Sequence, residues 1–369
     1  IDNPTSLNLE VDNGSLTGSG TLKQVTVLAG AEMNYTGNVN GSIVCAGTGT
    51  ISGSVVGALT LQSGGVFTNR GTFNNSFATA DGSLLVNEVG AKFNNFGTCT
   101  IVSNAVVINH GYLGDQASTA GQSITVDNGG TFEDTGEGWI TMDGALTIAS
   151  GGTFIPGGDG AGTTYIYKGS VTSGYPARVV MSQGSTNVFK VNKDLGQNTQ
   201  LQADYVDYGG SAKVKSFNGG TLLFENIGTT PFAPGDTFTI ARYSETGGAF
   251  TAFSGTATNT YPVMDPAAPG FGLAWNINGI TTSGIVNITG VATDPTNLVF
   301  NVSQSGANLI TQLSWPQDYT GWRLQEQQDT LAVGLGTNWV DVFGSQWTNS
   351  VTVTNSVNAG SGFFRMVYP

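Results

Sequence analysis

A short motif that recurs through the first half of the chain constrains its fold more than any other feature. Each copy consists of an alternating strand, a glycine turn and then one large apolar residue. Clear copies occupy residues 25–33, 59–67, 124–132 and 146–154. Internal repetition at a short period is the sequence signature of stacked, solenoid-like architectures. The motif therefore favours a rod-like structural or adhesive protein over an enzyme.

Weaker copies of the motif set the period of the repeat. With them, the copies start at residues 25, 43, 59, 84, 106, 124 and 146, about 20 residues apart, at the lower edge of the solenoid range. We expect successive coils to place their strands about 4.8 Å apart in parallel pairing. Equivalent apolar residues should form two internal ladders, one of Met33, Phe67, Phe132 and Phe154 and the other of Val27, Leu61, Val126 and Ile148.

An antiparallel sandwich or barrel is the alternative for this half, because it also shows short strands at regular spacing. Gly-Gly pairs such as Gly64-Gly65 and Gly129-Gly130 recur at one fixed place in three of the four clear copies, and this regularity favours coils. Composition indicates β structure in either case. Charged residues make up only 10% of the chain, against about 25% in an average globular protein. We find no segment with the apolar spacing of a helix.

The chain divides into three sections. Residues 1–170 carry the repeats and an N-terminal strand, and residues 171–292 read as a continuation of the solenoid or a closing β domain. Beyond a linker at residues 293–297, residues 293–369 hold four of the six tryptophans. Strand candidates there are 298–303, 310–315, 322–327, 339–343, 351–355 and 363–368. We predict an all-β protein: a parallel β-helix, a β-rich closing section and an immunoglobulin- or fibronectin-III-like sandwich.

Charge and hydropathy exclude several classes of partner. The net charge is −13, with only 12 Lys and Arg residues, which argues against nucleic acid and anionic membranes as partners. No apolar run approaches the roughly 18 residues of a membrane span. The chain begins with Ile1 and shows no signal-peptide pattern. We therefore expect an extracellular or cell-surface protein, exported with a signal peptide that has been removed.

Several stretches resemble a known class of bacterial proteins. Residues 220–223 and 232–238 resemble the closing part of pertactin-like passenger domains and the autotransporter-associated β-strand repeat proteins of environmental bacteria. The end of the chain also resembles a Trp-rich C-terminal module of such proteins, at residues 313–316, 321–325, 334–340 and 363–369. The resemblance implies a secreted or surface-displayed β-solenoid without known catalytic residues. True autotransporters carry a C-terminal membrane domain; we expect none in this protein, and therefore expect a free extracellular protein.

Candidate catalytic and metal-binding residues are few. His110 is the only histidine and lies in a predicted turn, where we expect a solvated side chain. Asp127, Glu133, Asp134 and Glu137 form an acidic cluster that could hold Ca²⁺ through carboxylate oxygens. Some β-solenoids cleave acidic polysaccharides with a Lys or Arg base beside bound Ca²⁺, but no basic residue lies within this cluster. The negative chain would also repel a polyanionic substrate.

In an exported protein, the two cysteines, Cys45 and Cys99, could form a disulfide. In the repeat register they fall on different faces of coils at least two steps apart, an axial offset of about 9.6 Å or more. A disulfide needs Cα atoms within about 7 Å. We therefore expect two free, buried thiols.

Two further segments are candidate interaction sites. We interpret Trp315 and Trp322 as core anchors of the sandwich. Trp347 lies among polar residues and is the better candidate for an exposed side chain that stacks on a sugar. The alternating N-terminal segment with Leu7, Leu9 and Val11 could cap the solenoid. It could instead add to an exposed strand of a neighbouring copy, and such head-to-tail contacts produce filaments.

These observations predict a non-enzymatic structural protein. We expect no cofactor, with bound Ca²⁺ as the one candidate. It would be a subunit of a homopolymeric extracellular filament, sheath or matrix, or an adhesin, with copies of itself as partners. A carbohydrate-binding surface protein, which would contact extracellular polysaccharide, is the first alternative. A β-helix enzyme that degrades polysaccharide is the second.

Overall fold

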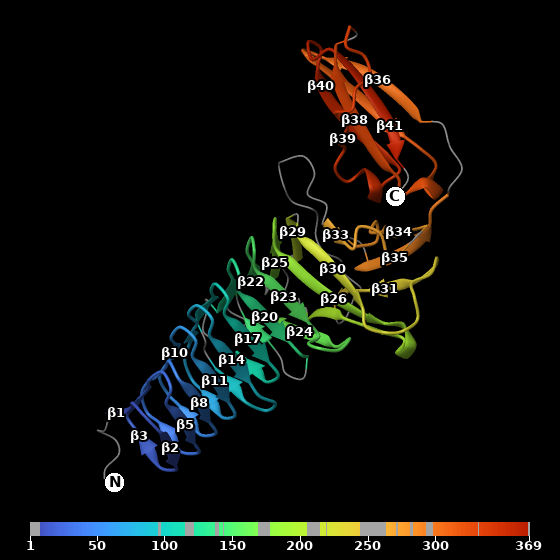
Figure 1. Ribbon diagram of the computed structural model, residues 1–369. Coiled ribbons are helices and arrows are strands. Elements are labelled where there is room, and N and C mark those ends of the chain that lie inside the picture. The colour runs from blue at the N-terminus through green and yellow to red at the C-terminus, as the bar shows by residue number, and fades with distance from the viewer. Residues whose placement is uncertain are drawn as a thin grey trace.

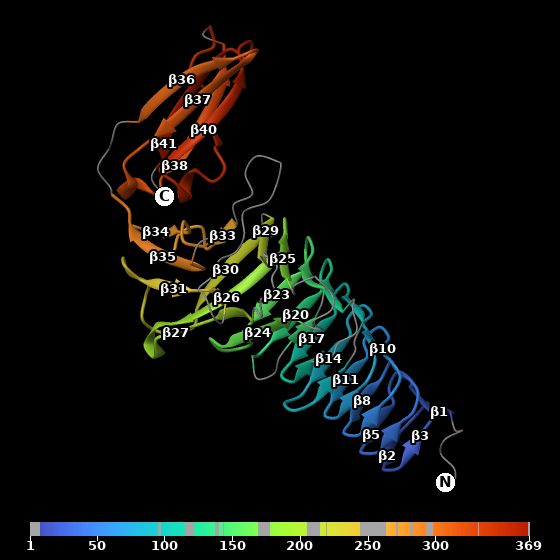
Figure 2. The ribbon, with the colours of Figure 1, turned by 180° about the vertical axis from the view of Figure 1, so that it is seen from behind.

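The computed structural model describes residues 8–94, 97–114, 122–136, 140–142, 144–168, 178–204, 215–218, 220–243, 263–270, 272–280, 283–292, 298–330 and 332–367. A rod of stacked parallel coils leads to a closing section and then to an antiparallel sandwich (Figure 1). The rear view shows the same succession, with the N-terminal coils farthest from the sandwich (Figure 2). The predicted all-β class and parallel β-helix are therefore confirmed.

Each coil contributes one strand to each of three faces of the rod. β4 (Gln24–Val27), β5 (Glu32–Tyr35) and β6 (Asn38–Val39) make up one coil, and β7 (Ile43–Cys45) begins the next. β7 pairs with β4 in parallel. Neighbouring strands on one face therefore belong to successive coils, as the repeat period predicts.

The three faces are built from four long sheets. Sheet A contains β1 (Asn8–Val11), β4, β7, β10 (Leu59–Leu61) and β13 (Phe77–Ala78), and sheet D continues its face with β16 (Thr98–Ile101), β19 (Ser123–Val126), β22 (Ala145–Ile148), β25 (Arg178–Ser182) and β29 (Lys215–Asn218). Sheet B contains β2 (Ser15–Gly18), β5, β8 (Thr48–Ile51), β11 (Val66–Asn69), β14 (Leu84–Asn87), β17 (Val106–Asn109), β20 (Thr131–Asp134), β23 (Thr153–Pro156), β26 (Thr186–Asn192), β30 (Thr221–Asn226) and β33 (Val263–Asp265), with β27 (Gln197–Asn198) beside β26. Sheet C contains β3 (Thr21–Leu22), β6, β9 (Ser54–Val55), β12 (Thr72–Phe73), β15 (Lys92–Phe93), β18 (Tyr112–Leu113), β21 (Ile140–Met142), β24 (Thr163–Lys168), β28 (Gln200–Asp204) and β32 (Ala241–Tyr243).

The alternating strands bury one side chain in two inside the coil. In β11, Phe67 and Asn69 are fully buried while Val66 and Thr68 are half-buried on the outside. The glycine turn lets each coil sit closely on the coil before it. Gly64 has a φ of +73°, and a Cβ on Gly65 would lie 2.3 Å from the Cys45 carbonyl oxygen of the preceding coil. Gly65 is therefore required by close stacking and Gly64 by backbone conformation.

Both predicted ladders are present. In sheet B one column of buried side chains contains Met33, Phe67, Leu85, Val107, Phe132 and Phe154, with Gly49 between the first two. On the face formed by sheets A and D, Val27 aligns with Cys45 and Leu61, and Ile101 aligns with Val126 and Ile148. Thr79 fills the gap between sheets A and D, because its hydroxyl donates to the Thr100 carbonyl and accepts from the Val102 amide. Inward residues thus form continuous columns along the rod.

The repeat copies assigned to residues 84 and 106 are one strand out of phase. The strands that begin there, β14 and β17, lie in sheet B, whereas the other copies start on strands of sheets A and D. In the same coils, the strands that lie in sheets A and D are β13 and β16. Phe93, nine residues after the assigned start, belongs to sheet C and stacks on Phe73 with ring centroids 4.7 Å apart. The assignment was wrong because strands of sheets A and B share the same apolar alternation.

A buried polar ladder runs along one corner of the same core. Asn69, Asn87 and Asn109 occupy successive coils and are fully buried. The Asn69 amide donates to the Asn87 side-chain oxygen over 2.9 Å, and the Asn87 amide donates to Asn109 over 2.8 Å. The Asn69 and Asn87 amides also donate to the main-chain carbonyls of Lys92 and Tyr112. Each buried amide is therefore paired, which removes most of the cost of placing polar groups in an apolar core.

The ladder ends in a carboxyl group. Asn109 donates to Asp134 Oδ1 over 2.7 Å, and the next residue in register is Pro156, whose side chain has no polar group. Asp134 is fully buried, and this desolvation raises its pKa to about 7, more than the hydrogen bond from Asn109 lowers it. The folded chain therefore keeps a proton on Asp134 at pH values where an unfolded chain has lost it.

Replacing Asp134 with Asn should stabilise the rod at alkaline pH. The raised pKa means that the wild-type chain loses stability as the pH rises from about 4 to above 7, by about 4 kcal/mol in total. Asn does not titrate and continues the amide ladder. Thermal unfolding of both proteins at pH 4 and pH 8 should show an advantage for the variant that grows with pH. An equal difference at both pH values would show that Asp134 does not titrate in this range.

A closing section covers the last coils of the rod. Its antiparallel sheet contains β31 (Thr237–Thr239), β35 (Ile285–Gly290) and β34 (Leu273–Asn276). Trp275 on β34 is fully buried, lies 4.6 Å from Phe224 of sheet B between ring centroids, and donates to the Pro266 carbonyl over 2.8 Å. One indole therefore joins the antiparallel sheet to the solenoid core.

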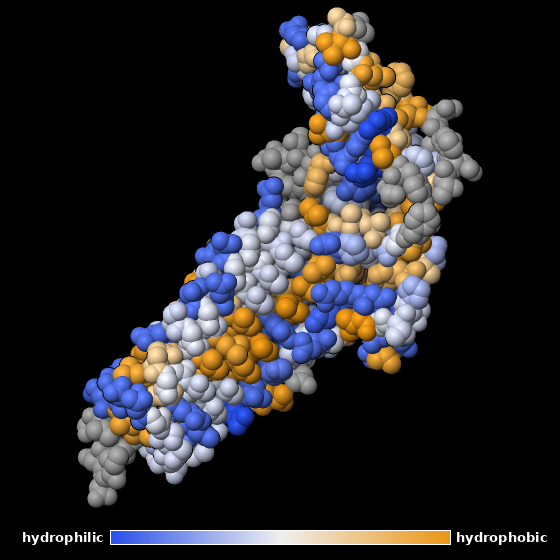
Figure 3. Space-filling view, viewed as in Figure 1, coloured by the Kyte–Doolittle hydropathy of each residue, from blue (hydrophilic) through white to orange (hydrophobic). Residues whose placement is uncertain are grey.

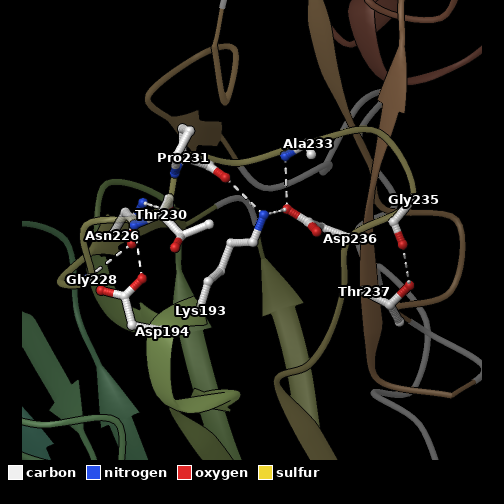
Figure 4. Close-up of polar contacts among 10 residues, drawn as sticks. All are labelled: Lys193, Asp194, Asn226, Gly228, Thr230, Pro231, Ala233, Gly235, Asp236 and Thr237. Carbon is white, nitrogen blue, oxygen red and sulfur yellow. Dashed lines mark hydrogen bonds and ion pairs between the residues drawn. The ribbon is translucent and has the colours of Figure 1, made fainter.

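A polar clamp fixes the loop that precedes β31 (Figure 4). It centres on the 3₁₀ turn η2 (Lys193–Leu195), which follows β26. The Lys193 ammonium contacts the Asp236 carboxylate over 2.5 Å and donates to the Pro231 carbonyl over 2.7 Å. The Asp194 carboxylate accepts from the main-chain amides of Thr229 and Thr230, and these hydrogen bonds lower its pKa well below the usual range. Both ends of the loop are thus tied to one turn.

Two three-stranded antiparallel sheets form the C-terminal unit. The first contains β36 (Val299–Ser305), β37 (Asn308–Ser314) and β40 (Ser350–Ser356), and the second contains β39 (Val340–Asp341), β38 (Arg323–Asp329) and β41 (Ser361–Val367). The 3₁₀ turns η3 (Gln317–Tyr319) and η4 (Ser345–Trp347) lie in its connections. All six predicted strands are therefore found, and the immunoglobulin- or fibronectin-like nature of the unit stays a prediction.

Candidate functional site

The sandwich has a well-packed end and an open end. At the packed end Leu313, Trp315 and Leu324 are buried from both sheets, and Trp322 packs against them and donates to the Ala292 carbonyl. The predicted roles of Trp315 and Trp322 as core anchors are therefore confirmed. The other end of the interior is not filled in this way.

An apolar groove of about 460 Å³ opens between the two sheets at that end. Phe300 and Val302 of β36 and Leu309 of β37 line one wall, and Phe364 of β41 lines the other. Phe300 is 65% exposed and Val302 is 51% exposed, although both project from the inner side of their sheet. Figure 3 shows hydrophobic side chains gathered along this side of the sandwich. Side chains in core positions are therefore left in contact with solvent.

The groove is electrically neutral. All of the described residues that line it are uncharged. Gln328 of β38 and Asn355 of β40 join the two sheets across it through an amide hydrogen bond of 2.6 Å. Glu326, on the same side of β38 as Gln328, is half-buried, and burial raises its pKa and so favours its neutral form. This surface suits an uncharged apolar occupant.

The exposure of Phe300 and Val302 has a simple geometric cause. In a two-sheet sandwich, the inner side chains of each strand are covered by a strand of the opposite sheet. Leu313 of β37 is covered in this way and is only 2% exposed. β36 and β41 are both edge strands and both line the groove. Among the described residues, no strand lies beyond β41 to cover the inner side of β36.

Sequence reasoning did not find this groove. It located the strand at residues 298–303, whose alternation of Phe300 and Val302 with polar residues is typical of a half-buried strand. That pattern indicates which side chains face inward, but it cannot show whether an opposite strand exists. The absence of charge between residues 298 and 317 was the available signal.

Trp347, the predicted sugar-stacking residue, is buried. It is 3% exposed, lies in η4, and belongs to the same core cluster as Trp275 of the closing section. Its ring meets Phe343 edge-on with centroids 5.6 Å apart. The prediction of an exposed indole was wrong because this side chain packs into the same core as the closing section, even though its sequence neighbours are polar.

Truncating Trp347 should loosen this junction. Trp347→Ala removes a buried indole, a change that typically costs about 3–5 kcal/mol. Trp339→Ala is the matched control, because Trp339 is half-buried with Arg365 stacked over its ring at 4.3 Å from the centroid. Urea unfolding of both variants should show a much larger loss for Trp347→Ala. Equal losses would contradict the anchoring role.

The predicted Ca²⁺ ligands do not converge. Asp127 lies in a turn and accepts from the Asn128 amide, whereas Glu133 and Asp134 project from opposite sides of β20. Glu137 lies outside the described residues. In the part of the chain that the structure describes, no group of three His, Cys, Asp or Glu side chains is placed to hold a metal ion. Glu133 is half-buried, and burial and then repulsion by Asp159 raise its pKa.

His110 is half-buried just after β17. Its Nδ1 lies 3.1 Å from the Thr135 hydroxyl in the next coil, which itself donates to the Asn109 carbonyl. The side chain thus takes part in the contacts between coils and is not the solvated loop residue that the sequence predicts.

The two cysteines are free and buried, as predicted. Burial raises the pKa of Cys45 to about 11 and that of Cys99 to about 12. The predicted separation onto different faces was wrong, because β7 and β16 lie on the same face of the rod. They are three coils apart, about 14 Å along the axis at about 4.8 Å per coil, which still excludes a disulfide.

The N-terminal segment forms a strand of its own solenoid. Leu9 and Val11 lie in β1, which pairs in parallel with β4 and places them beside Val25 and Val27. Leu7 lies outside the described residues. Residues 8–11 are therefore part of the first coil, where they provide the edge of sheet A.

Comparisons with protein-family models, with curated proteins and with solved structures each gave no match for this chain. The helical segments among the described residues are short 3₁₀ turns, and none has the length and hydrophobicity to cross a membrane.

Proposed function

We propose that the chain is an extracellular structural protein, a subunit of a homopolymeric surface filament, sheath or matrix, or an adhesin of the same build. The observation that carries the proposal is the continuous, filled solenoid. The eleven strands on the path of sheet B, from β2 to β33, form one parallel ladder. At about 4.8 Å per coil this gives a rod of about 50 Å.

Such a rod suits a mechanical or spacing role. Each coil contacts only its neighbours, so stability accumulates along the axis and the rod presents a fixed length. Its interior is occupied by apolar ladders and by the paired amides of Asn69, Asn87 and Asn109. The sandwich at one end, held by Trp347, offers an apolar surface for contact with another molecule.

Carbohydrate binding and polysaccharide cleavage are the alternatives. Trp347 is buried, and the half-buried Trp339 already has Arg365 over its ring. Of the acidic residues proposed for Ca²⁺, Glu133 and Asp134 project from opposite sides of β20. The described residues favour neither alternative over the structural role. The resemblance to autotransporter-associated repeat proteins, which implies a life outside the cell, remains a prediction and agrees with this proposal.

Electron microscopy of the purified full chain tests the proposal. At high protein concentration we expect rods of about 50 Å joined into longer or branched assemblies. The same preparation, incubated with a panel of neutral and acidic polysaccharides, should release no products. Isolated particles at every concentration, together with product release, would contradict the structural role and favour the enzyme.

A further inference from the structure

The groove of the sandwich has the form of a missing strand. Its two walls are the edge strands β36 and β41, and the inner side chains of β36 have no cover. The opposite sheet is therefore one strand too narrow on the β41 side. An added strand on the free edge of β41 would gain main-chain hydrogen bonds and place every second side chain in the groove.

β36 itself has the properties required of the added strand. Its seven residues are exposed and uncharged, and none is proline. Phe300 and Val302 alternate with Asn301 and Ser303, so the middle of the strand has one apolar side and one polar side. Edge strands are normally protected from pairing by charged residues, proline or bulges. The described part of β36 carries no such charge or proline.

We propose that β36 of a second copy fills this groove, and that the exchange is reciprocal. The sheet β40-β37-β36 of one copy would then continue into β41-β38-β39 of the other, and the same would hold for the second pair of sheets. Phe300 and Val302 of both copies would become buried between two six-stranded sheets. A contact of this kind is isologous and closes as a two-fold dimer.

The charge distribution of the chain permits a second copy at this place. Each chain carries a net charge of −13, so two copies repel one another over most of their surfaces. The groove and β36 are uncharged, and the apolar surfaces can meet there without bringing like charges into contact. Screening by salt should therefore strengthen the dimer.

Simple edge-to-edge pairing of β36 with its counterpart is a different arrangement. It would extend one sheet but leave the place beside β41 empty. The reciprocal arrangement is favoured because it covers Phe300 and Val302 and also pairs the free edges of both β36 and β41. The two arrangements predict different protection of the β41 backbone.

This inference rests on the proposed self-assembling role for its biological meaning, although the contact can be tested alone. Sedimentation velocity of the full chain, from about 1 to about 200 µM, should show a dimer that strengthens with salt. Val302→Lys places a charge in the groove and should weaken the dimer on the order of 100-fold. Ser303→Lys, one residue away on the outer side of β36, is the matched control and should retain the dimer.

Hydrogen exchange at low and high protein concentration identifies the contact. Amides of both β36 and β41 should become protected in the dimer. Both substitutions lie at exposed positions, so unchanged circular dichroism should show that the variants fold. A chain that stays monomeric at all concentrations, a dimer that survives Val302→Lys, or protection of β36 without β41 would each overturn the proposal. If the dimer survives Val302→Lys while electron microscopy still shows longer assemblies, the structural role stands and this interface is wrong.

Discussion

In-register stacking of parallel coils is the constraint on which the rest of this structure depends. Each inward side chain lies about 4.8 Å above its counterpart in the coil before it, so each column must accept the same kind of residue repeatedly. Apolar columns satisfy this condition by packing, as Phe132 and Phe154 do with ring centroids 5.7 Å apart. A polar column satisfies it only where each group bonds to the next one. Asn69, Asn87 and Asn109 achieve this because an amide side chain is both donor and acceptor.

The same constraint explains the weak points of the rod. Asp134 can accept the last amide but, once ionised, can donate to nothing further, and its position in the core makes ionisation costly. The rod also cannot end without protection, because the last coil exposes both its core and its strand edges. Trp275 and the Lys193–Asp236 pair attach the closing section at that end. Trp347 then attaches the sandwich to the closing section.

The repeats made the fold predictable from the sequence, since alternation and glycine spacing are local signals. Met33, Phe67, Phe132 and Phe154 fall into one column as expected. Local signals could not distinguish strands of different faces with the same alternation, and this is why the copies at residues 84 and 106 were misplaced. The position of Trp347 depends on contacts with residues about 70 positions earlier in the chain. Exposure of Phe300 depends on whether a strand lies opposite, which no local pattern records.

A reconstruction of the assembled protein by cryo-electron microscopy would test the central claim most directly, because it would resolve both the coils and the contacts between copies. The claim is that a rigid, in-register rod presents a sandwich with a vacant strand position for self-assembly. The account predicts three-strand coils at a spacing of about 4.8 Å and a strand from a second copy beside β41. Density for single chains, with the groove open and no contact between sandwiches, would contradict it.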